Sequence, residues 1–334
     1  MNKQDTGSLW PFHGGEQAVH ARLGITKQVA MYDRFIRRAM PDQHRTFFSD
    51  LPYVIIGAVD EQGFPWAMPV FDPYQGKGLS HQQFIDSPSS TRLVVNALPP
   101  VAKALGVSLE QNDRVGVLGI QLSTRRRNRM NGVVSQRDDG GFELEVDQSF
   151  GNCPKYIQVR DLQWRDDIPL LVSPDTSEVR PDLLSERARE FIELADTFFI
   201  ASRSEDLTQD ARHGVDVSHR GGKPGFVKVG ANKLVFPDYS GNKFFNTVGN
   251  IEADGRVGLF FPDFAGSNAL YLSGRAEIVW EGAEVTGFKG AERLISVTVE
   301  RWALLEDHLP MQGEIQEFSP HLKMTGHWSE VAVW

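Results

Sequence analysis

The stretch DVSHRGGKPGFVKVGANKLVFPDYSGNKFFNTVGN, residues Asp216–Asn250, carries the strongest structural signal in this chain. Gly221 and Gly222 predict a turn, because glycine adopts backbone angles that are closed to other residues. Strands are predicted at 225–229 and 233–236, where apolar and polar residues alternate on either side of a second turn. The stretch therefore predicts a compact β unit.

The end of this stretch predicts a phosphate site. Pro237 is expected to end the second strand, because proline has no N–H to donate to a ladder. Ser240–Asn242 can cap a helix that we expect to begin near Lys243. A helix start with open N–H groups, a lysine in its first turn and Arg220 before the hairpin would suit a phosphate. The predicted ligand is therefore a phosphorylated one.

Taken together, these motifs resemble the FMN-binding split barrel of the pyridoxamine 5'-phosphate oxidase superfamily. The resemblance rests on SHRGGKPGFV, FPDYSGN, FNTVGN and the earlier FGNCPKYIQ, which look like a bacterial group of flavin-nucleotide-binding proteins related to that oxidase. It covers most of the chain. By resemblance, Lys243 falls on the lysine of a Ser-x-Lys phosphate motif, and Phe236–Tyr239 falls beside the flavin ring. The oxidase's arginine and lysine after G-x-P are not matched, since Val227 and Val229 stand there.

The residue types and the resemblance together predict the cofactor site. The expected FMN-binding residues are Ser218, His219, Arg220, Gly221, Phe236, Pro237, Asp238, Tyr239, Asn242, Lys243, Arg125 and Arg127. Lys155 and Tyr156 are further ligand contacts that the resemblance implies. No catalytic residue is predicted, because the flavin itself would carry the redox chemistry. We expect His219 to form hydrogen bonds in a loop rather than to transfer protons, and Cys153 to be a buried structural cysteine.

Composition limits the function. A length of 334 residues favours two domains or one duplicated domain. A net charge of -9 argues against a nucleic acid or an anionic membrane as partner. The single cysteine excludes an intrachain disulfide, and no apolar run approaches the roughly 18 residues of a membrane-spanning helix, so we expect a cytoplasmic protein. The nine histidines are scattered without ligand spacing, so no metal site is expected.

The second half of the chain repeats the first. The matched segments are Phe47–Ala58 with Phe191–Ser202, Arg114–Gly116 with Arg256–Gly258, and Gly132 with Gly274. Because these matches follow one consistent order, they predict a duplicated domain. We expect an N-terminal helical segment at 1–45, with a helix over Gly14–Met40, and then a first split barrel at 46–160. An exposed linker at 161–182, which begins near Gln158, should lead to a second split barrel at 183–334 with the main FMN-phosphate motif.

The halves differ where the ligand is expected. The first half has no equivalent of FPDYSGNK and instead carries four arginines within Arg125–Arg129. A solvated surface run is one interpretation of these arginines. The resemblance implies another, in which their hairpin reaches across to the flavin of the other barrel. The predicted fold is therefore mostly β with flanking helices, two tandem split barrels that form an intrachain pseudo-dimer with one flavin. The chain is expected to be a monomer or a homodimer.

The resemblance implies an FMN-dependent oxidoreductase. The flavin would carry hydride or electrons to or from a small-molecule substrate or NAD(P)H, and the sequence does not choose between them. The alternative is a non-catalytic flavin- or haem-binding protein, because a fold does not determine a function.

Overall fold

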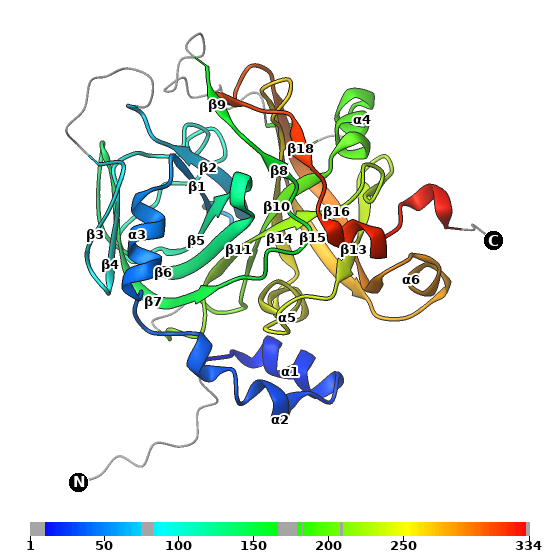
Figure 1. The fold of residues 1–334 in the computed structure, drawn as a ribbon, viewed down its shortest axis with the longest axis horizontal. Helices are drawn as coiled ribbons and strands as arrows, with labels where there is room; N and C mark the ends of the chain where they lie inside the picture. The colour runs from blue at the N-terminus through cyan, green and yellow to red at the C-terminus, as the bar shows by residue number, and fades with distance from the viewer. Residues whose placement is uncertain (1–10, 75–82, 166–178, 182, 208–209, 332–334) are drawn as a thin grey trace.

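The computed structural model describes residues 11–74, 83–165, 179–181, 183–207 and 210–331 (Figure 1). The helices are α1 Gly14–Arg22, α2 Thr26–Val29, α3 Asp42–Ser49, α4 Glu186–Leu194, α5 Asn246–Ala253 and α6 Ala283–Gly287. Short 3-10 turns lie at Asp33–Phe35, Leu122–Thr124, Pro320–Met324 and Trp328–Glu330. None of the described helices is long and apolar enough to cross a membrane.

Two antiparallel sheets of seven strands each dominate the structure. The first contains β1 Tyr53–Val59, β2 Pro65–Phe71, β3 Ile85–Ser89, β4 Arg92–Val95, β5 Arg114–Gln121, β6 Arg126–Asp138 and β7 Gly141–Gly151. The second contains β10 Thr197–Arg203, β11 Val215–Gly221, β12 Lys228–Val229, β13 Lys233–Tyr239, β14 Arg256–Asp263, β15 Asn268–Val279 and β16 Ala291–Leu305. The predicted fold class, mostly β with flanking helices in two tandem units, is confirmed.

The two sheets have the same topology. Their strand orders are β2-β1-β5-β6-β7-β4-β3 and β11-β10-β14-β15-β16-β13-β12, which coincide when each strand is replaced by its counterpart. The matched glycines Gly132 and Gly274 both lie at bulges. A Cβ atom added to Gly132 would lie 2.2 Å from the Glu145 carbonyl oxygen, and one added to Gly274 would lie 2.0 Å from the Thr298 carbonyl oxygen. Neither position therefore has room for a side chain. The predicted duplication is therefore visible strand by strand.

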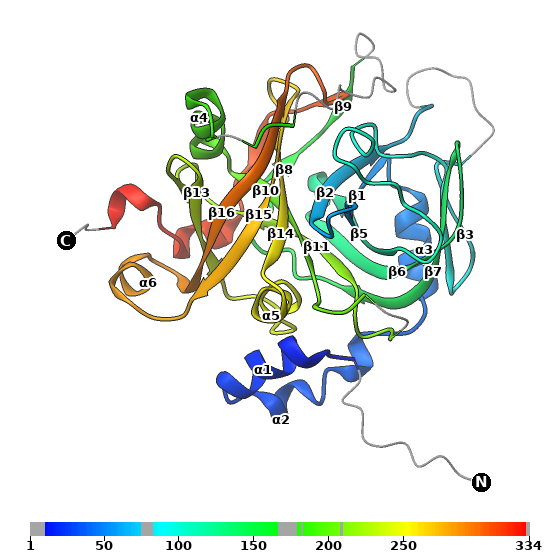
Figure 2. The same cartoon turned by 180° about the vertical axis from the view of Figure 1, so that it is seen from behind.

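The two halves pack against each other through equivalent strands (Figure 2). β2 contacts β14, and its counterpart β11 contacts β5. Gly258 lies so close to the first half that an added Cβ atom would be 2.1 Å from the Pro65 carbonyl oxygen. In the same way, a Cβ atom added to Gly116 would be 2.5 Å from the Val215 carbonyl oxygen. One apolar core crosses this interface, since Phe199 and Phe260 pack into the core of the first half. The halves thus form a pseudo-dimer within one chain.

The N-terminal segment is not one helix, so the prediction of a helix over Gly14–Met40 is wrong. Helix α1 ends at Arg22, because Gly24 takes a positive φ of 67°. In both views α1 lies next to α5 of the second half (Figures 1 and 2). A Cβ atom on Gly15 would meet the Gly249 carbonyl oxygen at 2.1 Å, so the two helices approach closely. The segment therefore covers the helix at which the sequence predicts a phosphate.

The chain between the two halves begins as part of the fold. β8 Val159–Arg160 pairs with β18 Ile315–Glu317, and β9 Gln163–Trp164 pairs with β17 Met311–Gln312. Gln158 is fully buried, and Arg160 forms an ion pair with Asp196 at 2.5 Å. The expectation of an exposed connector is therefore wrong for these two residues. Residues 166–178 and 182, within the expected linker, lie outside the described part.

The C-terminal tail packs back onto the second half. Trp328 donates from Nε1 to the Phe226 carbonyl oxygen at 3.0 Å, and its ring lies edge-on to Phe288. Trp334 lies outside the described residues.

A buried histidine of the first half gives a testable pH dependence. His44 on α3 is 6% exposed and shares a 2.8 Å hydrogen bond with the Ser149 hydroxyl. Burial, followed by the charges of Arg37 and Arg126, lowers the pKa of His44 to about 4. The unfolded chain binds this proton near pH 6.5, so the stability that is present above pH 6.5 is lost as the pH falls towards 4.

We expect the free energy of unfolding to fall by about 2 kcal/mol from this group between pH 7.5 and pH 5. Urea unfolding at the two pH values measures the loss. The variant His44→Gln keeps a hydrogen-bonding side chain but does not titrate, so its loss over the same range should be smaller by that amount. An identical loss in both proteins would contradict the assignment.

Candidate functional site

A cavity of about 830 Å³, counting the space at its mouth, lies between the two halves of the chain. The first half contributes Arg127 and Arg129 of β6 and residues of the segment that follows β7. The second half contributes the ends of β11 and β13 and the start of α5. Interfaces between two domains are preferred positions for small-molecule sites.

The structure brings together ten of the twelve predicted site residues. The cavity is lined by Ser218, His219, Arg220, Gly221, Pro237, Asp238, Tyr239, Asn242, Lys243 and Arg127. Phe236 and Arg125 do not line it. Phe236 is fully buried in the core of the second half. Arg125 instead donates to the Ile157 carbonyl oxygen at 3.0 Å and pairs with Glu317 at 2.9 Å, so it holds the C-terminal tail.

Two arginines cross from the first half to the second. Arg127 donates from Nε to the Cys153 carbonyl oxygen at 2.7 Å and reaches the His219 carbonyl oxygen at 3.3 Å. Arg129 donates to Asn246 Oδ1 at 3.0 Å and to the Ser218 hydroxyl, and lies 3.3 Å from an oxygen of Asp216. The arginine run is therefore more than a solvated surface.

The lining of the cavity is strongly cationic although the whole chain is acidic. Five cationic side chains line it, namely Arg127, Arg129, Lys155, Arg220 and Lys243. Asp238 is the one carboxylate among the described lining residues, and both Arg220 and Arg293 contact it. Burial, together with the neighbouring Arg129, lowers the pKa of Arg127 to about 9. Arg127 thus remains charged at neutral pH in an environment that disfavours its charge, and a bound anion would relieve this.

The buried side chain of His219 also lacks polar partners among the residues that the structure describes. It lies in strand β11 and not in a loop, so the expected loop position is wrong. The side chain is 4% exposed, and neither ring nitrogen has a hydrogen-bond partner among the described residues. Burial, and then the charges of Arg127 and Arg160, hold the pKa of His219 well below its usual value. Because unpaired polar atoms are rare in protein interiors, this neutral imidazole favours a polar ligand in the cavity.

The helix at the site begins later than expected. Lys243 and Phe245 both adopt positive φ angles, of 65° and 62°, which a helix cannot contain, so α5 starts at Asn246. Asn242 forms a local turn instead, since its Oδ1 accepts from the Phe244 N–H at 3.1 Å. No described side chain caps the first turn of α5. Its N–H groups are therefore available to an anion, and Lys243 stands next to them.

Aromatic side chains provide the apolar part of the site. The Tyr156 and Tyr239 rings lie 4.9 Å apart, and the Tyr156 hydroxyl donates to the Ser240 carbonyl oxygen at 3.3 Å. Pro237 lies inside strand β13 rather than at its end, so that expectation is wrong. Beside Pro237 the strand pairs only with β16, because β12 covers no more than Leu234 and Val235. Proline is tolerated at such an open edge.

Several lining residues escaped the sequence analysis. Arg129 follows Arg127 by two positions on β6, so strand periodicity would have placed both on one face. Asn246 and Thr247 lie within the quoted FNTVGN motif but carried no chemical signal of their own. Cys153 lines the cavity and is only partly buried, so the expectation of a buried structural cysteine is wrong.

The equivalent position in the first half is apolar. Strand registers place Pro69 where the second half has His219, and Phe71 where it has Gly221. On the facing hairpin, Tyr271 takes the place of Arg129. A cavity of about 270 Å³ remains there, and the described residues that line it include no charged side chain. Only one of the two pseudo-symmetric sites is therefore suited to an anionic ligand.

Two open sheets of identical topology, with contacts between β2 and β14 and between β11 and β5, define a tandem split β-barrel protein. Residues 184–307 match the family model described as pyridoxamine 5'-phosphate oxidase. This match confirms the resemblance to that superfamily for the second half of the chain. No curated protein sequence matches the chain.

The solved structures that match the chain are distant in sequence. The crystal structure of HupZ from Group A Streptococcus is 13% identical with a TM-score of 0.29, and the match covers 41% of this chain and 98% of that one. A protein from Clostridium acetobutylicum, related to general stress protein 26 and of the pyridoxinephosphate oxidase family, is 14% identical with a TM-score of 0.28. That match covers 39% of this chain and 92% of that one.

Proposed function

We propose that the cavity binds FMN and that the chain is an FMN-dependent oxidoreductase of the pyridoxamine 5'-phosphate oxidase-like superfamily. The observation that carries the proposal is that five cationic side chains from both halves, and a single carboxylate, are found among the described residues that line one cavity. FMN is an anion with a planar aromatic ring, so it needs both the cations and the apolar surfaces beside them.

The residues of the chain suit the two parts of the cofactor. Lys243 and the uncapped first turn of α5 would bind the phosphate. Arg127, with its charge poorly compensated by the protein, would stabilise negative charge on the reduced ring. His219 could form a hydrogen bond with a polar edge of the ring or with the substrate. FMN supplies the transfer of hydride or electrons when bound, and the chain binds it and orients the small-molecule substrate or NAD(P)H.

Titration of the purified chain with FMN tests the proposal. We expect saturation at one FMN per chain, because the pseudo-equivalent site in the first half is apolar. Riboflavin, which lacks the phosphate, should bind at least about 100-fold more weakly, since it loses the charge-assisted hydrogen bonds. Bleaching of the bound flavin by NADH or NADPH under anaerobic conditions would support the oxidoreductase. Two equivalents of FMN, or equal affinity for riboflavin, would contradict the proposed site.

A haem-binding protein is the second candidate function, and one observation favours it. His219 is buried at the cavity, and neither of its ring nitrogens has a partner among the residues that the structure describes. Neutral imidazole is a common axial ligand of haem iron. Titration with haem separates the two candidates. A Soret band that shifts on binding and is lost in His219→Ala would favour haem, whereas a flavin spectrum without such a band favours FMN.

A further inference from the structure

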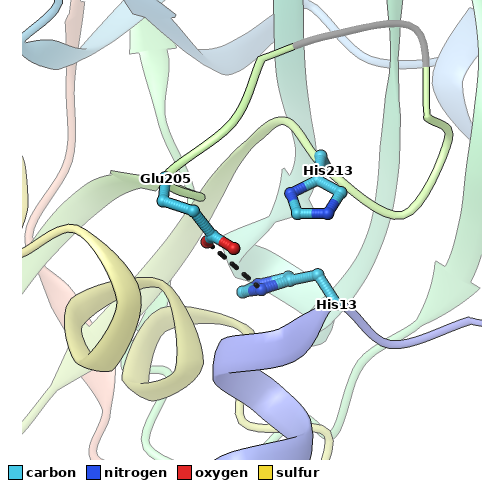
Figure 3. A group of neighbouring side chains, drawn as sticks. All are labelled: His13, Glu205 and His213. Atoms are coloured by element: carbon cyan, nitrogen blue, oxygen red, sulfur yellow. Dashed lines mark ion pairs between the residues drawn. The ribbon is translucent and has the colours of Figure 1, made fainter.

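Three side chains that can bind a metal ion meet beside the N-terminal segment (Figure 3). His13 immediately precedes α1, and Glu205 and His213 lie on the connection between β10 and β11. One ligand atom from each of the three lies within 4.8 Å of those of the other two. His13 Nδ1 is 3.9 Å from Glu205 Oε2, and the imidazole rings of His13 and His213 are 5.4 Å apart.

The two histidines have ring nitrogens that the described residues leave unpartnered. His13 is 3% exposed, and its Nε2 atom has no hydrogen-bond partner in the described part of the chain. The same holds for Nδ1 of His213, which is also shielded from solvent. Because buried polar atoms normally find a partner, the unpartnered Nδ1 of His213 favours a ligand in this cluster. Nε2 of His13 instead lies 3.7 Å from Oε2 of Glu16.

We propose that His13, Glu205 and His213 form a binding site for one divalent transition-metal ion of the zinc class, with water completing its coordination. Two imidazoles and one carboxylate are a donor set that zinc and its neighbours accept, and three protein ligands leave a position for water. The proposal is independent of FMN binding, because none of the three residues lines the flavin cavity.

The surroundings of His13 support this geometry. If Nδ1, which faces Glu205, binds the metal, then Nε2 carries the proton and lies 3.7 Å from Oε2 of the buried Glu16. A carboxylate behind a metal-binding histidine is a common arrangement that fixes the ring. Nδ1 now accepts from the Gly15 N–H at 3.1 Å, and the metal bond would replace this hydrogen bond.

The charges around the cluster also favour a cation. Besides Glu205, the carboxylate of Asp216 acts on His13, and the opposing charge is that of Arg212. Arg212 is paired with Asp210, so its charge is largely compensated. A bound ion would fasten the N-terminal segment to the β10–β11 connection, and α1 in turn packs on α5. Sequence spacing does not reveal this site, because His13 lies 192 positions before Glu205.

The test is calorimetric titration of the full chain with zinc chloride after removal of metals with a chelator. We expect one zinc ion per chain, and at least a tenfold weaker affinity in both His213→Ala and Glu205→Gln. The variants leave the buried His13 in place, so they test the site without removing its helix cap. Cobalt(II) should give the visible absorption of a tetrahedral site in the unmodified chain and lose it in both variants.

His327→Ala is the matched control, since His327 is another partly exposed histidine that pairs with a glutamate, Glu330, outside the cluster. It should keep the zinc affinity of the unmodified chain. Absence of zinc binding at 100-fold molar excess, or equal affinity in His213→Ala and the unmodified chain, would overturn the proposal. A loss of affinity in His327→Ala equal to that in His213→Ala would overturn it as well, because binding would then be non-specific.

Discussion

Replacement of Arg127 by glutamate is expected to weaken FMN binding by about 100-fold or more. The change removes a charge-assisted hydrogen-bond donor. It also places a carboxylate beside the proposed FMN anion, so the two negative charges would repel each other. Arg127 contacts only backbone carbonyl groups of Cys153 and His219 among the described residues, so no protein carboxylate is left unpaired by its loss. Fluorescence titration with FMN measures the effect.

The neighbouring arginine offers the control. Arg126 lies on the same strand, but it donates to the Gln43 carbonyl oxygen and lies over the Phe47 ring, away from the cavity. Arg126→Glu should therefore bind FMN as the unmodified chain does. Arg127→Gln separates charge from packing, and we expect an intermediate loss with an unchanged midpoint of thermal unfolding. If Arg126→Glu and Arg127→Glu lost affinity equally, the effect would come from overall charge and not from the site.

A valine at Gly258 should destabilise the fold by about 3 kcal/mol or more, because there is no room for a side chain between β14 and β2. The added Cβ atom would lie 2.1 Å from the Pro65 carbonyl oxygen, and neither backbone can move without disturbing the core that crosses the interface. Urea unfolding monitored by tryptophan fluorescence gives the free energy, since Trp66 is fully buried beside this contact.

The pseudo-symmetry of the two halves allows the same substitution to be tested at the equivalent glycine. Gly116 makes the equivalent approach to the Val215 carbonyl oxygen, so Gly116→Val should cause a loss of similar size. Gly230→Ala is the control, because the nearest atom to its added Cβ would be 3.6 Å away. Full stability of both valine variants would mean that the two halves do not pack as described.

The repeated pattern was sufficient to predict the duplication, whereas the split-barrel fold followed from the family resemblance. Tyr53–Val59 and its counterpart Thr197–Arg203 are both buried strands rich in apolar residues, so the duplication can be recognised from the sequence alone. The quoted motif also located most of the site, because glycine, proline and charged residues cluster in it. These are local signals, and they survive in sequence since each reflects a requirement of a few neighbouring residues.

Contacts between distant segments were beyond such reasoning. Glu16 accepts a hydrogen bond from Asn246 Nδ2 at 2.6 Å, and no pattern near residue 16 points to the cavity. Strand β13 continues through Pro237 because β12, its partner on one side, ends before that residue, while β16 continues to pair on the other side. The order of strands in the sheet is needed to see this. The late start of α5 depends on two left-handed residues, Lys243 and Phe245, which have no propensity for that conformation.

Covalent fusion of the two halves has a consequence for their divergence. In a symmetric homodimer every substitution appears twice, so a residue that improves one pocket also alters its twin. Here Arg129 and its counterpart Tyr271 belong to one polypeptide and are encoded separately. A substitution at one of these positions leaves the other unchanged, which is impossible for identical subunits.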